Sequence, residues 1–137
     1  MNTPAMEAVV LEPLADVAHE VGADDLASQL LEMRQLLSVD LTALETQLQT
    51  LQGLSVEPEA AKAAARYLIA SGGKRLRPLI VLLAAQLGDP VDRKKVRDLA
   101  VTSELVHAAT LLHDDVIDEG DERRGRPAAR RVYSNSA

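Results

Sequence analysis

Six carboxylates crowd the expected C-terminal end of one helix, at Asp114, Asp115, Asp118, Glu119, Asp121 and Glu122. The C-terminal end of a helix carries partial negative charge, so the helix dipole and mutual repulsion both disfavour this cluster. Asp114 and Asp118 are one turn apart and project from the same face. Mg²⁺ suits such a pair, because it takes one or two carboxylates, keeps several waters and recruits phosphate oxygens. The alternative is a solvated acidic helix end.

A basic segment shows the opposite mismatch. Gly72-Gly73-Lys74-Arg75-Leu76-Arg77-Pro78 places three cations at the expected N-terminal end of a helix, which attracts anions. The two glycines let the backbone approach a ligand closely. A diphosphate would satisfy the cations, the free N–H groups and the dipole together. The alternative is a basic turn that covers a helix end.

Three further residues could contact phosphate. His107 lies seven residues before Asp114, two helical turns away on the same face, and could donate a hydrogen bond. Its alternative is a partly buried histidine with a protein partner. Arg123 and Arg124 follow the acids and would supply forked donors to phosphate, or would simply compensate the neighbouring carboxylates.

The elements that must position these residues are helical. Apolar residues at steps of three and four form one stripe, made of Leu30, Met33, Leu37, Leu41, Leu44, Leu48 and Leu51, with a break expected near residues 38–40. Further helices are expected over 59–70, 78–87 and 91–119, and residues 121–137 read as a loop. Residues 3–21 are weakly helical, and we expect Pro13 to interrupt them. With no strand alternation, the predicted class is all-α.

Composition limits the possible functions. The chain has 137 residues, no Cys, and a formal net charge of −6. Residues 1–60 carry eleven acids and one base, and residues 61–137 carry ten acids and fourteen bases. The acidic balance argues against bulk binding of nucleic acid, whereas the local basic excess allows an anionic small ligand. No signal peptide or transmembrane segment is apparent, so we expect a soluble cytoplasmic protein.

The expected helix over 78–87 bears on whether the fold is complete. Its sequence, including Leu79-Ile80-Val81-Leu82-Leu83, is apolar on nearly every side, and such a helix is normally buried all round. Four helices could bury it only in a thin core. We therefore expect that part of the helical bundle is absent from this chain and is supplied by another.

Together, the basic segment 72–78, the acidic segment 112–118 and Arg123-Arg124-Gly125-Arg126-Pro127 resemble the trans-polyprenyl diphosphate synthases, the head-to-tail isoprenyl transferases. The resemblance implies that residues 26–137 form the N-terminal half of an isoprenoid-synthase-type helical domain, preceded by an arm at 1–25. It implies Mg²⁺-dependent condensation of isopentenyl diphosphate with an allylic diphosphate.

The resemblance also implies residue roles. Lys74, Arg77 and His107 would bind isopentenyl diphosphate, and the basic segment as a whole, Arg75 included, is assigned to substrate binding. Asp114 and Asp118 would bind Mg²⁺, with Asp115 assisting in catalysis. Arg123 would contact the allylic diphosphate and Arg124 the isopentenyl diphosphate. Small residues at the predicted product tunnel, at Ala108, Ala109 and Thr110, imply a longer product.

The chain lacks the second aspartate-rich motif that the family carries on a later helix. We therefore expect a subunit of a split, heteromeric synthase that is active only with a partner chain supplying that motif. Two alternatives remain: a non-catalytic subunit that regulates another prenyl synthase, and an inactive truncated fragment.

Overall fold

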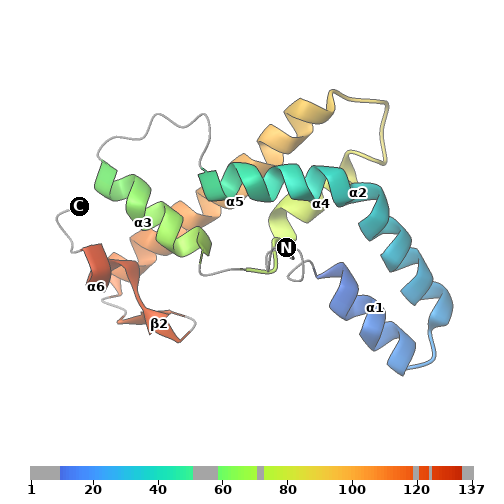
Figure 1. Ribbon diagram of the computed structural model, residues 1–137, viewed down its shortest axis with the longest axis horizontal. Helices are drawn as coiled ribbons and strands as arrows, with labels where there is room; N and C mark the ends of the chain where they lie inside the picture. The colour runs from blue at the N-terminus through green and yellow to red at the C-terminus, as the bar shows by residue number, and fades with distance from the viewer. Residues whose placement is uncertain (1–9, 51–58, 71–72, 119–120, 124, 134–137) are drawn as a thin grey trace.

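The computed structural model describes residues 10–50, 59–70, 73–118, 121–123 and 125–133. In these ranges the chain forms six helices and one two-stranded ribbon (Figure 1). The helices are α1 (Leu11–Glu20), α2 (Asp24–Thr50), α3 (Glu59–Ala70), α4 (Leu76–Ala84), α5 (Arg93–Ile117) and α6 (Ala129–Tyr133), and the strands are β1 (Glu122–Arg123) and β2 (Arg126–Pro127). The predicted all-α class is confirmed. No helix in the described ranges is both long and apolar enough to cross a membrane.

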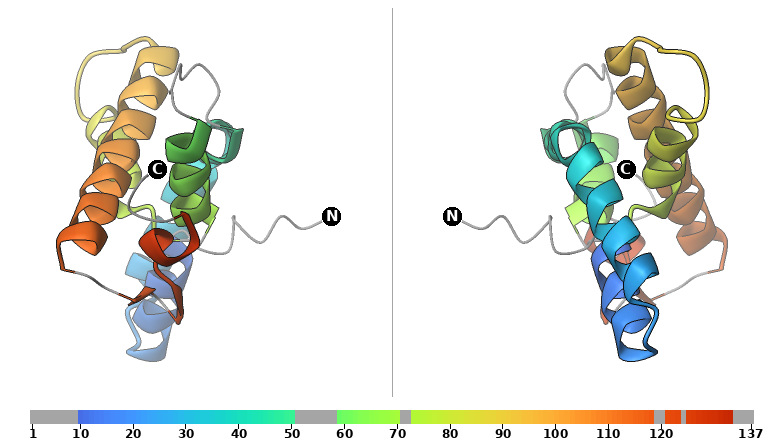
Figure 2. Two further views of the ribbon diagram at one scale, coloured as in Figure 1. Left: turned by 90° about the vertical axis from the view of Figure 1, so that its left-hand side faces the viewer. Right: turned by 90° about the vertical axis from the view of Figure 1, so that its right-hand side faces the viewer.

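α2 forms the centre of the fold because its apolar stripe is buried. Leu37, Leu41, Leu44 and Leu48 are all buried, and they share one core cluster with residues of α3, α4 and α5. Figure 2 shows α4 and α5 packed beside each other on one side of α2.

The expected break near residues 38–40 is wrong, because α2 is one continuous helix that changes direction partway along its length (Figure 1). Thr42 Oγ1 donates to the carbonyl of Ser38 at 2.9 Å, and Thr46 and Thr50 repeat this pattern one and two turns later. Threonine hydroxyls that bond to the preceding turn bend a helix without ending it.

α1 packs on α2 as a helical hairpin. The expected interruption at Pro13 is also wrong, because α1 runs through this residue. Pro13 lies in the first turn of α1, where a missing backbone N–H costs no helical hydrogen bond. The buried residues of the hairpin interface are small, at Ala15, Ala18 and Ala27, and the partly buried Ala23 and Leu30 pack against them. Gly22, with a φ of +79°, ends α1: its amide donates to the His19 carbonyl, and the Ala23 amide donates to the Ala18 carbonyl.

Residues 1–9 of the predicted arm lie outside the described residues, and the division at residue 25 stays a prediction.

α3 has the predicted bounds, and α5 begins two residues inside its predicted range because Asp92 caps it. The Asp92 carboxylate accepts a hydrogen bond from the Lys94 amide at 2.9 Å. α4 begins two residues before the expected start and ends three residues before the expected end. Leu79 and Leu82 are buried, but Ile80 is 56% exposed, so the described residues cover one side of α4 rather than all of it.

The expected loop over residues 121–137 is wrong for its described part. β1 and β2 pair antiparallel, with Glu122 opposite Pro127 and Arg123 opposite Arg126. Gly125 adopts a φ of +72°, the left-handed conformation that a tight hairpin turn needs. α6 then packs against α3 and α5.

An ion cluster joins the middle of α2 to the start of α5. Asp40 is only 3% exposed and accepts hydrogen bonds from Arg93 Nη2 at 2.6 Å and from Arg97 Nη1 at 2.8 Å. Burial raises the pKa of the Asp40 carboxyl, but the hydrogen bonds from Arg97 and Arg93 outweigh burial and hold its pKa below the ordinary value of 3.8.

Asp40→Asn should therefore destabilise the chain by about 1–3 kcal/mol at pH 7, since it removes the charge that two arginines share. A carboxyl whose pKa is lowered by folding adds stability above its unfolded pKa and loses it as the pH falls through the folded value. Urea unfolding of wild type and variant should thus differ at pH 7 and converge in acid, once the pH falls below the lowered pKa of Asp40. The exposed Asp89→Asn is the matched control, and a gap that persists in acid would contradict this assignment.

Candidate functional site

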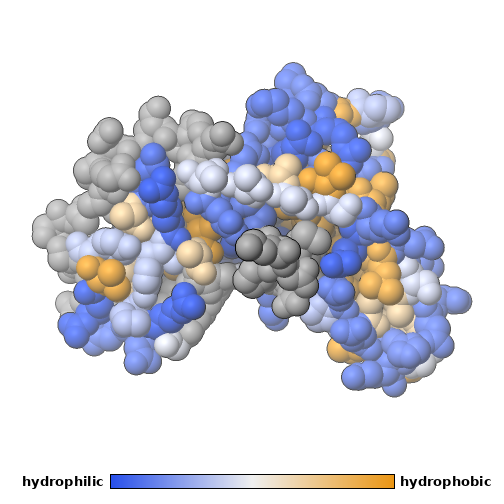
Figure 3. Space-filling view, viewed as in Figure 1, coloured by the Kyte–Doolittle hydropathy of each residue, from blue (hydrophilic) through white to orange (hydrophobic). Residues whose placement is uncertain are grey.

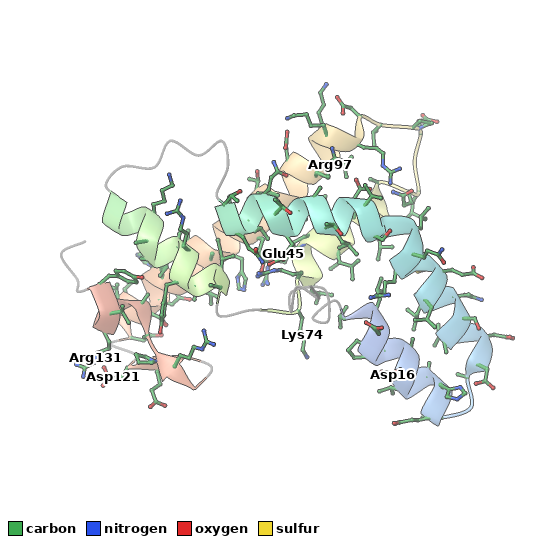
Figure 4. The ribbon with its side chains drawn as sticks, viewed as in Figure 1. Asp16, Glu45, Lys74, Arg97, Asp121 and Arg131 are labelled. Carbon is green, nitrogen blue, oxygen red and sulfur yellow. The ribbon has the colours of Figure 1, made fainter. Side chains whose placement is uncertain are left out.

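The basic segment divides its cations between the surface and the interior. Lys74 and Arg77 are exposed, whereas Arg75 is only 7% exposed. Figure 4 shows Lys74 pointing away from the helices. Arg75 caps α4 with a φ of 48°, the one positive φ of a non-glycine residue in the described ranges. A left-handed arginine costs about 1–2 kcal/mol, so its surroundings must compensate.

The Arg75 guanidinium is held by two carboxylates and a carbonyl. Its Nε and Nη2 donate to the two carboxylate oxygens of Glu45 at 3.0 and 3.1 Å. Nη1 donates to Glu104 at 3.2 Å, and Nη2 also donates to the carbonyl of Ile69 at 3.1 Å. Burial lowers the pKa of Arg75, but the hydrogen bonds and charges of Glu45 and Glu104 outweigh it and raise the pKa above its ordinary value.

The acidic segment likewise separates exposed from buried carboxylates. Asp114 and Asp118 are exposed, and the Asp118 amide donates to the Asp114 carbonyl at 2.8 Å as α5 ends. Asp115 is buried, at 5% exposure. The described residues contain no group of three or more side chains that could hold a metal ion. Two exposed carboxylates one turn apart nevertheless fit Mg²⁺, which completes its shell with water and phosphate oxygens.

A small cavity of about 20 Å³ lies between the basic segment and α5. Arg75, Glu104, His107 and Ala108 line it, together with Leu68, Ile69 and Leu111. This volume has room for about one water molecule and is far too small for a diphosphate. Of the predicted tunnel residues, Ala108 is buried beside the cavity, whereas Ala109 and Thr110 are exposed. The described residues therefore bring His107 and Ala108 close to Arg75 without forming a complete substrate pocket.

The ribbon that carries Arg123 is anchored to α3 by a tyrosine. Tyr67 Oη donates to the carbonyl of Pro127 at 2.8 Å, and its ring meets Tyr133 edge-on with centroids 5.9 Å apart. Asp121 and Arg131, labelled in Figure 4, form an ion pair at 3.5 Å that crosses from the ribbon to α6. The backbone of Arg123 lies in β1, the orientation of its side chain is outside the described part, and Arg124 lies outside the described residues altogether.

A larger cavity, of about 380 Å³, lies away from both motifs at the opposite end of α4. Asp40, Leu82, Gln86, Val91, Arg93 and Val96 are among the residues that line it. Nothing in the sequence patterns predicted this hollow.

The residues that hold the site together were not predicted from the sequence; they are Glu45, Glu104 and Tyr67. A signal for the two glutamates was present. Glu45 follows Leu41 by four residues in the apolar stripe of α2, and Glu104 lies four residues from both Ala100 and Ala108 on α5. A carboxylate within an apolar stripe predicts a buried ion pair, although its partner cannot be found from spacing alone.

The sequence matches the model of the polyprenyl synthetase family over residues 58–137, a range that includes both motifs. The chain belongs to this family.

Curated relatives extend the match toward the N-terminus. The chain is 45% identical to heptaprenyl diphosphate synthase component 2 of Geobacillus stearothermophilus over 103 residues, which are 75% of this chain and 31% of that protein. It is 39% identical over 84 residues to all-trans-nonaprenyl-diphosphate synthase (geranyl-diphosphate specific) of Rhodobacter capsulatus, covering 61% and 26% of the two chains. Against octaprenyl diphosphate synthase of Escherichia coli the identity is 45% over 71 residues, covering 52% and 22%. The matches span less than a third of each relative.

Tyr67→Phe should loosen the ribbon without unfolding the helices, because it removes one hydrogen bond worth about 0.5–1.5 kcal/mol. Hydrogen exchange should show faster exchange at the Ala128 amide, which donates to the Asp121 carbonyl at 2.8 Å. Tyr133→Phe keeps both rings of the pair and is the control. Equal exchange at Ala128 in wild type and Tyr67→Phe would show that the tyrosine does not anchor the ribbon.

Proposed function

We propose that this chain supplies the isopentenyl diphosphate site and the first aspartate-rich motif of a trans-polyprenyl diphosphate synthase. The observation that carries the proposal is the family match over a range in which both mismatched charge clusters present exposed groups. Lys74 and Arg77 flank the start of α4, and Asp114 and Asp118 lie at the end of α5. Cations at the start of α4 and carboxylates at the end of α5 are unfavourable beside the helix dipoles. Binding of an anion at the first and of a cation at the second would compensate this cost.

Each residue has a role in this proposal. Lys74, Arg77 and His107 hold the diphosphate of isopentenyl diphosphate, and Arg124 contacts it as well. Asp114 and Asp118 would hold Mg²⁺, with Asp115 assisting, and Arg123 would contact the allylic diphosphate. Mg²⁺, when bound, supplies positive charge that stabilises the departing diphosphate.

The reaction needs no protein nucleophile. The carbon–oxygen bond of the allylic diphosphate breaks to give an allylic cation and pyrophosphate. The alkene of isopentenyl diphosphate then forms the new carbon–carbon bond, and the released pyrophosphate takes up the proton whose loss restores the double bond. The chain's part is to bind and align the two diphosphates through its cations and carboxylates, and to keep water from the cation with apolar residues such as Ala108 and Leu111. The small side chain of Ala108 is compatible with a longer prenyl product.

We propose that further polypeptide completes the site. Two relatives are named as component 2 of heptaprenyl diphosphate synthase, a name that implies more than one component. On this chain, apolar residues of α4 and α5 remain more than 45% exposed, at Leu76, Ile80, Leu99, Val106 and Ile117. Figure 3 shows a further apolar patch over the α1–α2 hairpin. Exposed apolar surfaces of this kind are typical of faces that another polypeptide covers. We propose that the covering polypeptide carries the second aspartate-rich motif. We also propose a cytoplasmic location, since a chain without cysteine has no need of an oxidising compartment.

The test is reconstitution. The purified chain is assayed alone and with a polypeptide that carries the remaining family length, using isopentenyl diphosphate, an allylic diphosphate and Mg²⁺. Activity is expected only in the mixture. Asp114→Ala should lower it by about 100-fold or more, because charge stabilisation of the leaving group is lost. Removal of Mg²⁺ by a chelator should abolish it, and added Mg²⁺ should restore it.

Asp16→Ala is the matched control, since Asp16 is an exposed carboxylate on α1 and belongs to neither charge cluster (Figure 4). It should leave activity within about twofold of wild type. If Asp114→Ala and Asp16→Ala behave alike in an active mixture, the chain is a regulatory subunit and the catalytic proposal is wrong.

A further inference from the structure

Arg75 differs from its basic neighbours because its charge is already matched inside the protein. Four hydrogen bonds to Glu45, Glu104 and the Ile69 carbonyl use four of the five N–H donors of its guanidinium. The side chain is 8% exposed. Arg75 therefore has neither the exposure nor the free donor fork that a diphosphate ligand needs, in contrast to Lys74 and Arg77.

The partners of Arg75 come from three different helices. Glu45 lies on α2, Glu104 lies on α5, and the Ile69 carbonyl lies at the end of α3. The Arg75 carbonyl in turn accepts the Leu79 amide at 3.1 Å, in the first turn of α4. One side chain thus ties the start of α4 to the other three helices of the core.

The contact with Glu104 bears directly on the candidate site. Glu104 precedes His107 by three residues, so the two lie about one turn apart on α5. Both line the small cavity together with Arg75. The position of Arg75 therefore sets the position of the segment carrying Lys74 and Arg77 relative to His107.

We propose that Arg75, held by Glu45 and Glu104, is a positioning residue that fixes the separation between the Lys74–Arg77 segment and His107, and through it the affinity for isopentenyl diphosphate. This inference rests on the proposed function, and it replaces the ligand role that the sequence suggested for Arg75. The geometry requires arginine, because a bidentate guanidinium–carboxylate pair fixes the relative orientation of the two side chains as well as their distance. Lysine would keep the charge but lose this constraint.

The first experiment does not depend on activity. Hydrogen exchange of the full chain is compared for wild type, Arg75→Lys and Glu45→Gln, with Arg34→Lys as the control for an arginine paired with one carboxylate, Glu12, at 3.4 Å. Arg75→Lys and Glu45→Gln should each speed exchange of the Leu79 amide about tenfold, and Arg34→Lys should leave it unchanged. Unchanged exchange in both test variants would overturn the positioning role, whatever the chain's activity.

The second experiment uses the reconstituted active assembly and separates KM from kcat. Arg75→Lys and Glu45→Gln should each raise KM for isopentenyl diphosphate about tenfold, with KM for the allylic diphosphate and kcat within about twofold. Their effects should be less than additive in the double variant, because both break the same pair.

The other outcomes contradict the inference. A raised KM in Arg75→Lys but not in Glu45→Gln would make Arg75 a direct ligand. Equal loss in kcat and in both KM values would make the cluster merely structural. A wild-type assembly with no isopentenyl-dependent activity would contradict the proposed function instead, and the exchange data alone would then decide whether Arg75 positions the segment.

Discussion

Glu104 on α5 is buried and the Glu45 side chain on α2 is only 15% exposed, and a carboxylate removed from water is costly unless a cation accompanies it. Arg75 supplies that cation for both. Because Glu45 and Glu104 lie on different helices, their pairing with Arg75 couples the positions of α2 and α5 to that of the basic segment. Removing one partner of such a cluster leaves a charge unpaired in the core and is costly, so the three side chains hold α2, α4 and α5 in the observed arrangement. The contacts of the Arg75 side chain offset the cost of its left-handed backbone conformation.

The same constraint sorts the charges of the candidate site. Since Arg75 is turned inward, Lys74 and Arg77 are left facing outward on either side of it. On α5, burial of Asp115 accompanies exposure of Asp114 and Asp118, as the helical period requires. The site therefore consists of exposed charges carried on a scaffold whose own charges are already paired. In the proposed function, diphosphate and metal would bind to these exposed charges without first breaking internal ion pairs.

The helices were predictable wherever a strong local signal existed. The period of the leucine stripe predicted α2, and alanine-rich sequence before two glycines predicted α3 with its observed bounds. Predictions failed where a local signal was weaker than packing. Pro13 is tolerated in the first turn of α1, and α2 continues through residues 38–40. The strands β1 and β2 pair as a ribbon, which Tyr67 contacts from a distant part of the chain.

The sequence by itself determined which chemistry is possible: residue types and spacing are local properties, so the basic and acidic clusters, their helix-end placement and the family could all be recognised from the chain. Only the tertiary structure decided which of those charges face solvent. Lys74, Arg75 and Arg77 are equivalent cations in the sequence, and Arg75 is distinguished only by Glu45 and Glu104, which lie 30 and 29 residues away from it along the chain. Partners so distant in sequence meet through the packing of helices, which no local pattern encodes.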